Sequence, residues 1–245
     1  VLGNNVTMQD TVTATGQIVS DPASKVTLNG DVTSTAGIGT VTTEQFDASN
    51  TQTGKTVIDS MDDSVSGGII LGETTAGAVT LKTEGGNISL GDNSILDGTT
   101  VSAESADLNK TVYSNDGGSW NTVASTEKLG TIEGSVTLGE NTTVKGNSTL
   151  TADDSVITGN TTADGVISAG GQISIGDGTQ VLDNTATSDG KAAINLADGQ
   201  TLYIGSGAIL SGNTSNGVSG SVQAGQNTRL NVYTDATAYT FINDG

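Results

Sequence analysis

The chain lacks histidine and cysteine entirely among its 245 residues. Without histidine there is no Ser-His-Asp or Cys-His catalysis, no imidazole zinc site and no common general base near neutral pH. Without cysteine there is no disulfide framework and no thiolate metal site. Phosphate-binding loops of the GxxxxGK[ST] type are also absent. Most hydrolase templates fail, and we expect no cofactor.

Basic residues are scarce. Eight Lys and Arg face 27 Asp and Glu, which gives a formal net charge of −19. Such a field repels nucleic-acid phosphates and anionic membrane surfaces, so we expect no nucleic-acid partner. Apolar runs near the roughly 20 residues that span a bilayer are missing too, so this segment is not expected to be embedded in a membrane. Turn carboxylates can hold adventitious calcium, but no calcium-binding motif is present and no required metal is expected.

Aromatic residues make up only 3% of the chain, and there is a single proline against 35 glycines. The interior must therefore be filled by Val, Ile, Leu and Ala. Glycine, Asp and Asn supply frequent tight turns between short β-prone runs. This composition favours a narrow, evenly repeated core over a wide globular one.

A degenerate repeat is the strongest internal signal. An apolar-x-apolar triplet runs into a Gly/Asp/Asn turn, and a second apolar residue and another turn follow. The four clearest copies are Ile88–Gly98, Val136–Asn147, Ile173–Asn184 and Leu202–Asn213. Because their spacing is irregular, a fixed-period array is disfavoured, whereas a solenoid with turns of varying length is not.

Alternation along each strand points the two apolar residues of a triplet inward. We therefore predict an all-β fold, a right-handed parallel β-helix (β-solenoid) of about ten coils, forming one domain over 1–245. The alignment places four residues at equivalent inward positions: Leu90, Leu138, Ile175 and Ile204. We further expect the chain to be a fragment of a longer exported protein.

Two stretches interrupt the repeat, at 42–63 and 104–128. They are predicted to be loops that leave the solenoid, with long rungs bearing polar corners as the alternative. The second stretch carries the candidate binding residues Tyr113, Asp116 and Trp120, since Trp and Tyr are enriched at binding hot spots and Trp120 is the only Trp. The competing interpretation is that Trp120 covers the core beneath a long loop.

A polysaccharide-cleaving β-helix is the enzymatic alternative, because carboxylate pairs perform acid/base chemistry in such enzymes. The only adjacent acidic pairs are Asp62-Asp63 and Asp153-Asp154. Neighbouring strand residues point to opposite faces, so such pairs are more typical of solvated corners than of catalytic dyads. We therefore expect no catalytic residue and no enzyme.

Segments Val136–Thr142 and Tyr203–Asn213 resemble the passenger domains of self-associating autotransporter adhesins of Gram-negative bacteria, with a likeness in strand-and-turn style over 79–233. The resemblance implies a β-helix exported to the outer cell surface, where it binds host proteins or glycans, or identical copies on neighbouring cells. The C-terminal membrane barrel of that family is absent from this sequence, and so is a GDSG-like protease motif. Adhesion is thus the expected function, with a structural stalk that displays another domain as the alternative.

Overall fold

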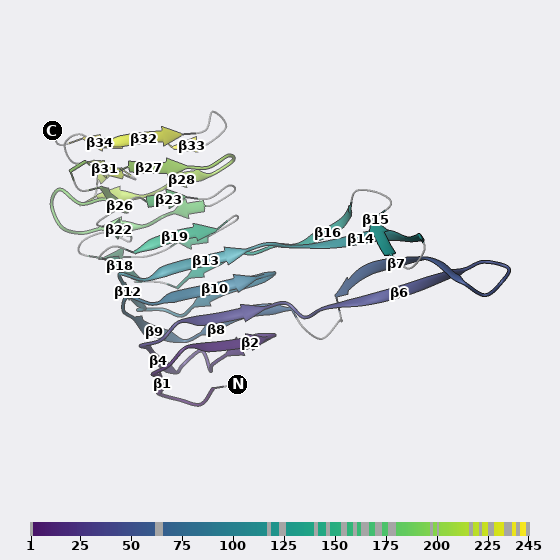
Figure 1. Ribbon diagram of the computed structural model, residues 1–245. Helices are drawn as coiled ribbons and strands as arrows, with labels where there is room; N and C mark the ends of the chain where they lie inside the picture. Colours follow the sequence, from purple (N-terminus) through teal and green to yellow (C-terminus); the bar gives the residue numbers. More distant parts are fainter. Residues whose placement is uncertain are drawn as a thin grey trace.

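The computed structural model describes residues 2–61, 66–116, 119–122, 126–139, 142–145, 148–152, 156–158, 161–162, 167–169, 173–175, 180–196, 198–199, 201–215, 218–220, 222–224, 228–232, 237–238 and 241–243. Over these residues the protein is all-β, with no helix and mostly parallel sheets. Within the same residues, accordingly, no helix is long and apolar enough to cross a membrane. The strands pile up in layers from the N-terminus to the C-terminus, and an arm projects from one side (Figure 1).

Three long parallel sheets build the stack. Sheet I has nine strands, in the order β1 (Val6–Met8), β4 (Lys25–Leu28), β9 (Glu73–Ala76), β12 (Ile95–Asp97), β18 (Thr143–Lys145), β22 (Ile167–Ala169), β26 (Ile194–Leu196), β31 (Val222–Ala224) and β34 (Phe241–Asn243). Sheet II has five strands, β2 (Val12–Thr15), β5 (Val32–Thr35), β10 (Thr80–Glu84), β13 (Thr100–Glu104) and β19 (Thr149–Ala152). Sheet III has eight strands, β3 (Gln17–Val19), β8 (Gly67–Leu71), β11 (Gly86–Leu90), β17 (Val136–Leu138), β20 (Val156–Thr158), β24 (Gln180–Leu182), β28 (Ile209–Ser211) and β33 (Thr237–Ala238).

The chain visits these sheets in a fixed order. From β1 to β20 it passes from sheet I to sheet II to sheet III and back to sheet I, one layer further along. From β20 onward a three-stranded parallel sheet takes the turn of sheet II, and it consists of β23 (Ile173–Ile175), β27 (Thr201–Ile204) and β32 (Arg229–Val232). A small sheet is added between sheets III and I, and its strands are β21 (Thr161–Thr162), β25 (Thr185–Ala186), β29 (Thr214–Ser215) and β30 (Val218–Ser219).

Rows of aliphatic side chains fill the interior, because parallel pairing stacks equivalent residues directly over one another, about 4.8 Å apart. In sheet III, Ile18 pairs with Ile69, which pairs with Ile88, which pairs with Val136, and all four side chains are buried. The buried core of the described residues contains Val, Ile, Leu and Ala with one Met, and no aromatic side chain. A narrow aliphatic core is what the composition predicts.

The prediction of four equivalent inward residues is half correct. Leu90, Leu138, Ile175 and Ile204 are all buried, each with at most 2% of its surface exposed. Leu90 pairs with Leu138 in sheet III, however, whereas Ile175 pairs with Ile204 in the three-stranded sheet. The four triplets therefore occupy two different sheets, because the same triplet-and-turn pattern is used at two different corners of the layers.

The arm is an antiparallel sheet made by the two interruptions of the repeat. Its strands are β6 (Ile38–Phe46), β7 (Gln52–Met61), β14 (Ala106–Asp116), β15 (Ser119–Thr122) and β16 (Glu127–Ile132). The order across the sheet is β15-β14-β7-β6, and β16 also pairs with β14. The predicted loops are thus strands over most of their described length, and the arm begins before residue 42 and ends after residue 128.

Candidate functional site

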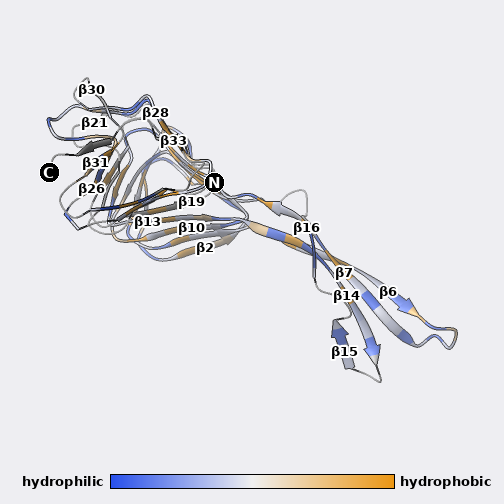
Figure 2. Cartoon of the chain, turned by 90° about the horizontal axis from the view of Figure 1, so that it is seen from above, coloured by the Kyte–Doolittle hydropathy of each residue, from blue (hydrophilic) through white to orange (hydrophobic). Residues whose placement is uncertain are grey.

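Both interruptions leave the stack at the same corner, between a strand of sheet II and a strand of sheet III (Figure 2). At two corners of this kind that the structure describes without an interruption, one glycine turns the chain: Gly16 between β2 and β3, with φ 91°, and Gly85 between β10 and β11, with φ 69°. Left-handed backbone of this kind is accessible to glycine without steric cost. At the interrupted corners β5 and β13 instead run on toward β6 and β14, so two strands of sheet II extend into the arm.

Gly85 lies between the roots of the two interruptions. A Cβ atom placed on it would come within 2.8 Å of Ala106 Cβ and 3.0 Å of Ala36 Cβ. The backbone hydrogen bonds continue through this layer, since Gly85 N donates to Glu104 O and Ala36 N donates to Glu84 O, both at 2.8 Å. The missing side chain of Gly85 therefore allows the two interruptions to start close together.

One lysine bridges two acidic residues at this corner. Lys82 Nζ lies 2.9 Å from a carboxylate oxygen of Glu84 and 3.2 Å from one of Glu104, the residues that end β10 and β13. Its hydrogen bond with Glu84, and then that with Glu104, raises the pKa of Lys82 above its usual value. The bridge ties two neighbouring strands of sheet II on their solvent face where the arm departs.

Pairing of β7 with β14 joins the two interruptions into one sheet. The register runs from Lys110 opposite Ile58 to Ser114 opposite Gly54. Side chains reinforce it, because Asn115 Nδ2 donates to Gln52 O at 3.1 Å and Asp59 Oδ2 accepts from Asn109 N at 3.0 Å. Segments about fifty residues apart in the sequence thereby form a single arm.

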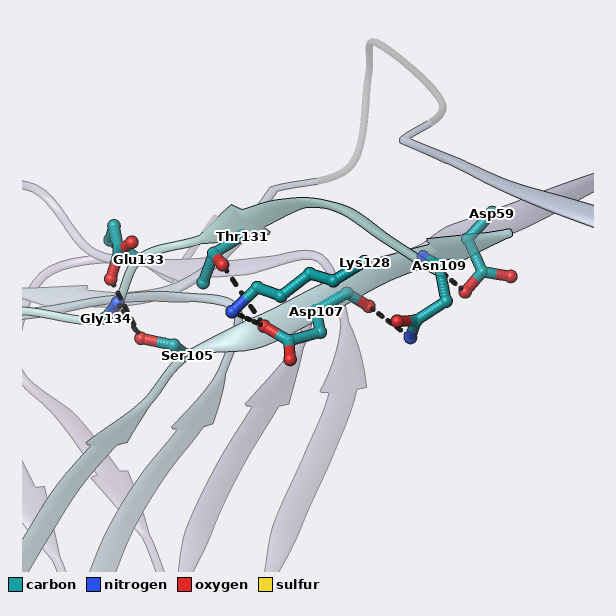
Figure 3. Close-up of polar contacts among 8 residues, drawn as sticks. All are labelled: Asp59, Ser105, Asp107, Asn109, Lys128, Thr131, Glu133 and Gly134. Atoms are coloured by element: carbon teal, nitrogen blue, oxygen red, sulfur yellow. Dashed lines mark hydrogen bonds and ion pairs between the residues drawn. The ribbon is translucent and has the colours of Figure 1, made fainter. Parts of the chain in front are cut away.

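A polar network fixes the base of the arm (Figure 3). Lys128 Nζ lies 2.7 Å from Asp107 Oδ1, and Thr131 Oγ1 donates to the same oxygen at 3.1 Å. Ser105 Oγ donates to Glu133 Oε2 and accepts from Gly134 N. The hydrogen bond from Lys128 is the main cause that lowers the pKa of the Asp107 carboxyl. β14 and β16 are therefore connected by side chains as well as by backbone pairing.

The turn between β6 and β7 is also ordered. Asp47 Oδ1 accepts hydrogen bonds from Ser49 N at 2.8 Å and Thr51 N at 2.9 Å, and Asp47 N donates to Thr51 O. Asn50 takes a positive φ of 60°, a conformation that Asn tolerates better than most residues. A single carboxylate thus closes the hairpin and fixes the register of its two strands.

A lysine and two aromatic rings meet on one face of the arm. Lys55 Nζ lies 5.1 Å from the centroid of the Tyr113 ring and 4.8 Å from that of the Trp120 ring. Lys55 and Tyr113 are directly opposite each other in β7 and β14, and Trp120 in β15 is opposite Asn115. These distances are typical of cation–π contacts. We call Lys55, Tyr113 and Trp120 the aromatic cluster.

Two of the three sequence-predicted binding residues belong to this cluster. Tyr113 is half-buried and Trp120 keeps 38% of its surface exposed. Trp120 lies in the arm and not over the core, so the competing interpretation of this residue is wrong. Asp116 ends β14, where its backbone is paired with Ser119, and its side chain lies outside the described residues.

Lys55 was not predicted. It belongs to the first interruption, whereas both rings belong to the second, and nothing in the sequence indicates that the two pair with each other. Burial of apolar residues also differs from that in the stack, because five large apolar side chains of the arm are exposed: Ile38, Val41, Phe46, Trp120 and Leu129. The arm therefore presents apolar, aromatic and charged groups to solvent on a thin sheet.

Acidic residues of the described part of the chain do not gather into a metal site. No group of three or more acidic residues among them is placed to hold a metal ion. The adjacent pairs Asp62-Asp63 and Asp153-Asp154 lie outside the described residues. What the arm brings together is the exposed Trp120 ring, the half-buried Tyr113 ring and the ammonium group of Lys55.

Comparison with known proteins adds no relative. No family model, no curated protein and no solved structure matches this chain. The function proposed below therefore depends on the sequence and on the geometry of the arm.

Proposed function

We propose that the chain is a right-handed parallel β-helix and the adhesive part of a bacterial protein exported to the outer cell surface. The fixed visiting order of sheets I, II and III supports the helix, as does the stacking of apolar residues in rows. Sheet I has nine strands, which corresponds to nine passes of the chain, close to the number proposed from repeat length. The right-handed sense is the one that nearly all connections between parallel strands adopt.

The arm is the observation that carries the adhesive function. A stalk needs only the stack, yet two separate interruptions extend from the same corner and pair to form one projecting sheet. That sheet extends away from the stack (Figures 1 and 2). Its strands β7, β14 and β15 carry the aromatic cluster, in which Trp120 is exposed. Projecting segments on a rigid scaffold are where binding residues concentrate.

Tyr113 and Trp120 supply aromatic rings against which a sugar ring or an apolar side chain can pack, and Lys55, whose ammonium group lies over both rings, supplies a positive charge. The partners we propose are a host surface protein or glycan, or identical copies on neighbouring cells. Each contact is small, but many copies on one cell raise the effective concentration, so weak contacts suffice. The protein acts by binding and not by catalysis.

Display of the chain on beads tests this function. Beads that carry the chain are expected to clump, or to bind a glycan and protein array, and the double variant Tyr113→Ser, Trp120→Ser is expected to weaken binding to the array. Tyr203→Ser is the matched control, since Tyr203 is 41% exposed but lies in β27 of the stack. If the beads neither clump nor bind the array, the stalk is favoured. If the control and the double variant lose array binding to the same extent, a site in the arm is contradicted.

A further inference from the structure

The outer edge of the arm is an unprotected strand. β6 is nine residues long and ends its sheet, with β7 on one side and no described strand on the other. From Thr40 to Phe46 every residue is exposed. The backbone N–H and C=O groups along the free edge of β6 can therefore pair with another strand.

The opposite edge of the arm differs in the features that block such pairing. There two short strands, β15 and β16, divide the edge between them. The exposed charges Glu127 and Lys128 protect β16, whereas β15 is uncharged and is protected only by its length of four residues. Natural proteins protect free edges with charged residues, lysine above all, and with proline. β6 contains no lysine and no proline, and Glu44 is its single charged residue. β6 is therefore the longest edge strand of the arm without lysine or proline, since the uncharged β15 has only four residues.

We propose that β6 pairs antiparallel with β6 of a second copy of this chain, across a two-fold axis at Thr42. This inference rests on the proposed adhesive function and names its partner. In this register Ile38 lies opposite Phe46 of the partner copy, Thr40 opposite Glu44, and Thr42 opposite Thr42. The two apolar residues at the ends of the strand, 36% and 52% exposed in the single chain, cover each other.

Charge selects the antiparallel arrangement. Parallel in-register pairing would place Glu44 opposite Glu44 and would bring two stacks with a net charge of −19 each to the same end of the joined arms. Antiparallel pairing places each Glu44 opposite a neutral threonine. Because β6 runs outward from the stack, it also places the two stacks at opposite ends of the joined arms. That arrangement suits a contact between chains displayed on two facing cells.

Sedimentation equilibrium of the purified chain tests the pairing. The chain is expected to form a dimer, and Thr42→Lys is expected to weaken it about tenfold, because two lysines then face each other on the strand edge. Thr42→Gln, exposed and uncharged at the same site, is the control and should retain the dimer. A chain that remains monomeric up to about millimolar concentration, or a dimer that Thr42→Lys leaves unchanged, would overturn the proposal.

Substitutions at Thr40 test the register. Thr40→Lys is expected to tighten the dimer about fivefold, because each of the two symmetry-related lysines then faces Glu44 of the partner copy. Thr40→Glu is expected to weaken the dimer by a similar factor, because each new carboxylate faces Glu44. Thr40 also lies opposite Asp59 of its own chain, so a charge at this position has a second neighbour. Both variants are therefore repeated in a Glu44→Gln chain, where the difference in dimer affinity between Thr40→Lys and Thr40→Glu should disappear. Equal dimerisation of Thr40→Lys and Thr40→Glu would exclude this register.

The clumping of beads separates this inference from the proposed function. If beads clump and Thr42→Lys abolishes clumping, both stand. If beads clump or bind the array while Thr42→Lys changes neither clumping nor sedimentation, the adhesive function stands and the pairing of β6 is wrong. If the Thr40 and Thr42 variants change dimer affinity in solution as expected but the beads neither clump nor bind the array, the pairing of β6 stands and the adhesive function fails.

Discussion

Lys55 Nζ lies 4.8 Å from the ring centroid of Trp120, although the two residues come from different interruptions of the repeat. The contact exists only because β7 pairs with β14, and β14 in turn pairs with β15. Trp120 is the only Trp of the chain, so its fluorescence reports on this one place. The lysine and the ring together thus provide a direct probe of whether the arm is assembled.

Lys55→Gln is expected to shift the emission of Trp120 and to weaken the docking of β7 on β14. Exposed cation–π contacts contribute about 0.5–1 kcal/mol, so the arm should loosen while the stack remains folded. Fluorescence measures the first effect, and hydrogen exchange of the β7 and β14 amides measures the second. Lys25→Gln is the control, because Lys25 pairs with Glu73 in sheet I. An unchanged emission spectrum in Lys55→Gln would contradict the contact.

Two of the three residues of the aromatic cluster could be predicted from the sequence. Tyr113 and Trp120 stand out because aromatic residues are rare and these two fall in a break of the repeat. Lys55 does not stand out, since a lysine in a polar stretch is usually a solvated residue. Its role comes from long-range antiparallel pairing, and a single sequence carries no signal for which distant segments pair.

Burial in the stack can be tested on two adjacent residues. In β12, Leu96 is fully buried, whereas Ile95 is 38% exposed. Leu96→Ala is expected to lower the free energy of unfolding by about 2–5 kcal/mol, because it leaves a cavity in the row of apolar residues. Ile95→Ala should change it by about 0.5 kcal/mol. Denaturant unfolding followed by circular dichroism provides the measurement. Equal losses would contradict the difference in burial, and a larger loss in Ile95→Ala would show that β12 faces the other way.

The alternation of buried and exposed residues along a strand explains which part of the fold could be predicted from the sequence and which could not. The inward burial of Leu90, Leu138, Ile175 and Ile204 follows from the strand period of two. Their equivalence does not follow, because the turn after each triplet looks alike at every corner of a layer. Only pairing partners, Leu138 for Leu90 and Ile204 for Ile175, distinguish one sheet from another.

Two stacked asparagines are a further test of the layers. Asn213 Oδ1 accepts from Asn184 N at 3.0 Å and from Asn184 Nδ2 at 2.9 Å, and Asn213 Nδ2 donates to Val181 O at 2.8 Å. Both side chains are buried. Asn213→Leu is expected to cost about 2 kcal/mol or more, since these buried groups lose their partner. Asn29→Leu, at an exposed residue, should cost far less. A small loss of stability in Asn213→Leu, measured by thermal or denaturant unfolding, would argue against the hydrogen bonds between the stacked asparagines.

Acid should break the ion pair at the base of the arm. The pKa of Asp107 is lowered mainly by its hydrogen bond with Lys128, so the contact is present above the ordinary value of 3.8 and is lost as the pH falls through the lowered value. A titration of the Asp107 carboxyl carbon by NMR should therefore show a midpoint below 3.8, and Lys128→Met should raise it. Lys25→Met, remote from Asp107, should leave the midpoint unchanged. A midpoint that ignores Lys128 would mean that the two side chains do not pair in solution.

Gly85→Ala tests how the two interruptions come to share one arm. The substitution should destabilise the fold for two reasons. The φ of 69° at this position lies in the left-handed region, which costs an alanine about 1–2 kcal/mol. The added Cβ would also lie 2.8 Å from Ala106 Cβ. The roots of β6 and β14 should then move apart, so the β7–β14 amides should exchange faster than those of the hairpin β6–β7. Gly130→Ala is the matched control, since a Cβ at Gly130 of β16 would meet nothing within 4 Å and its backbone is not left-handed. If Gly85→Ala exchanges like the unmodified chain, the close approach at the corner does not position the arm, and the β7–β14 pairing alone must hold it together.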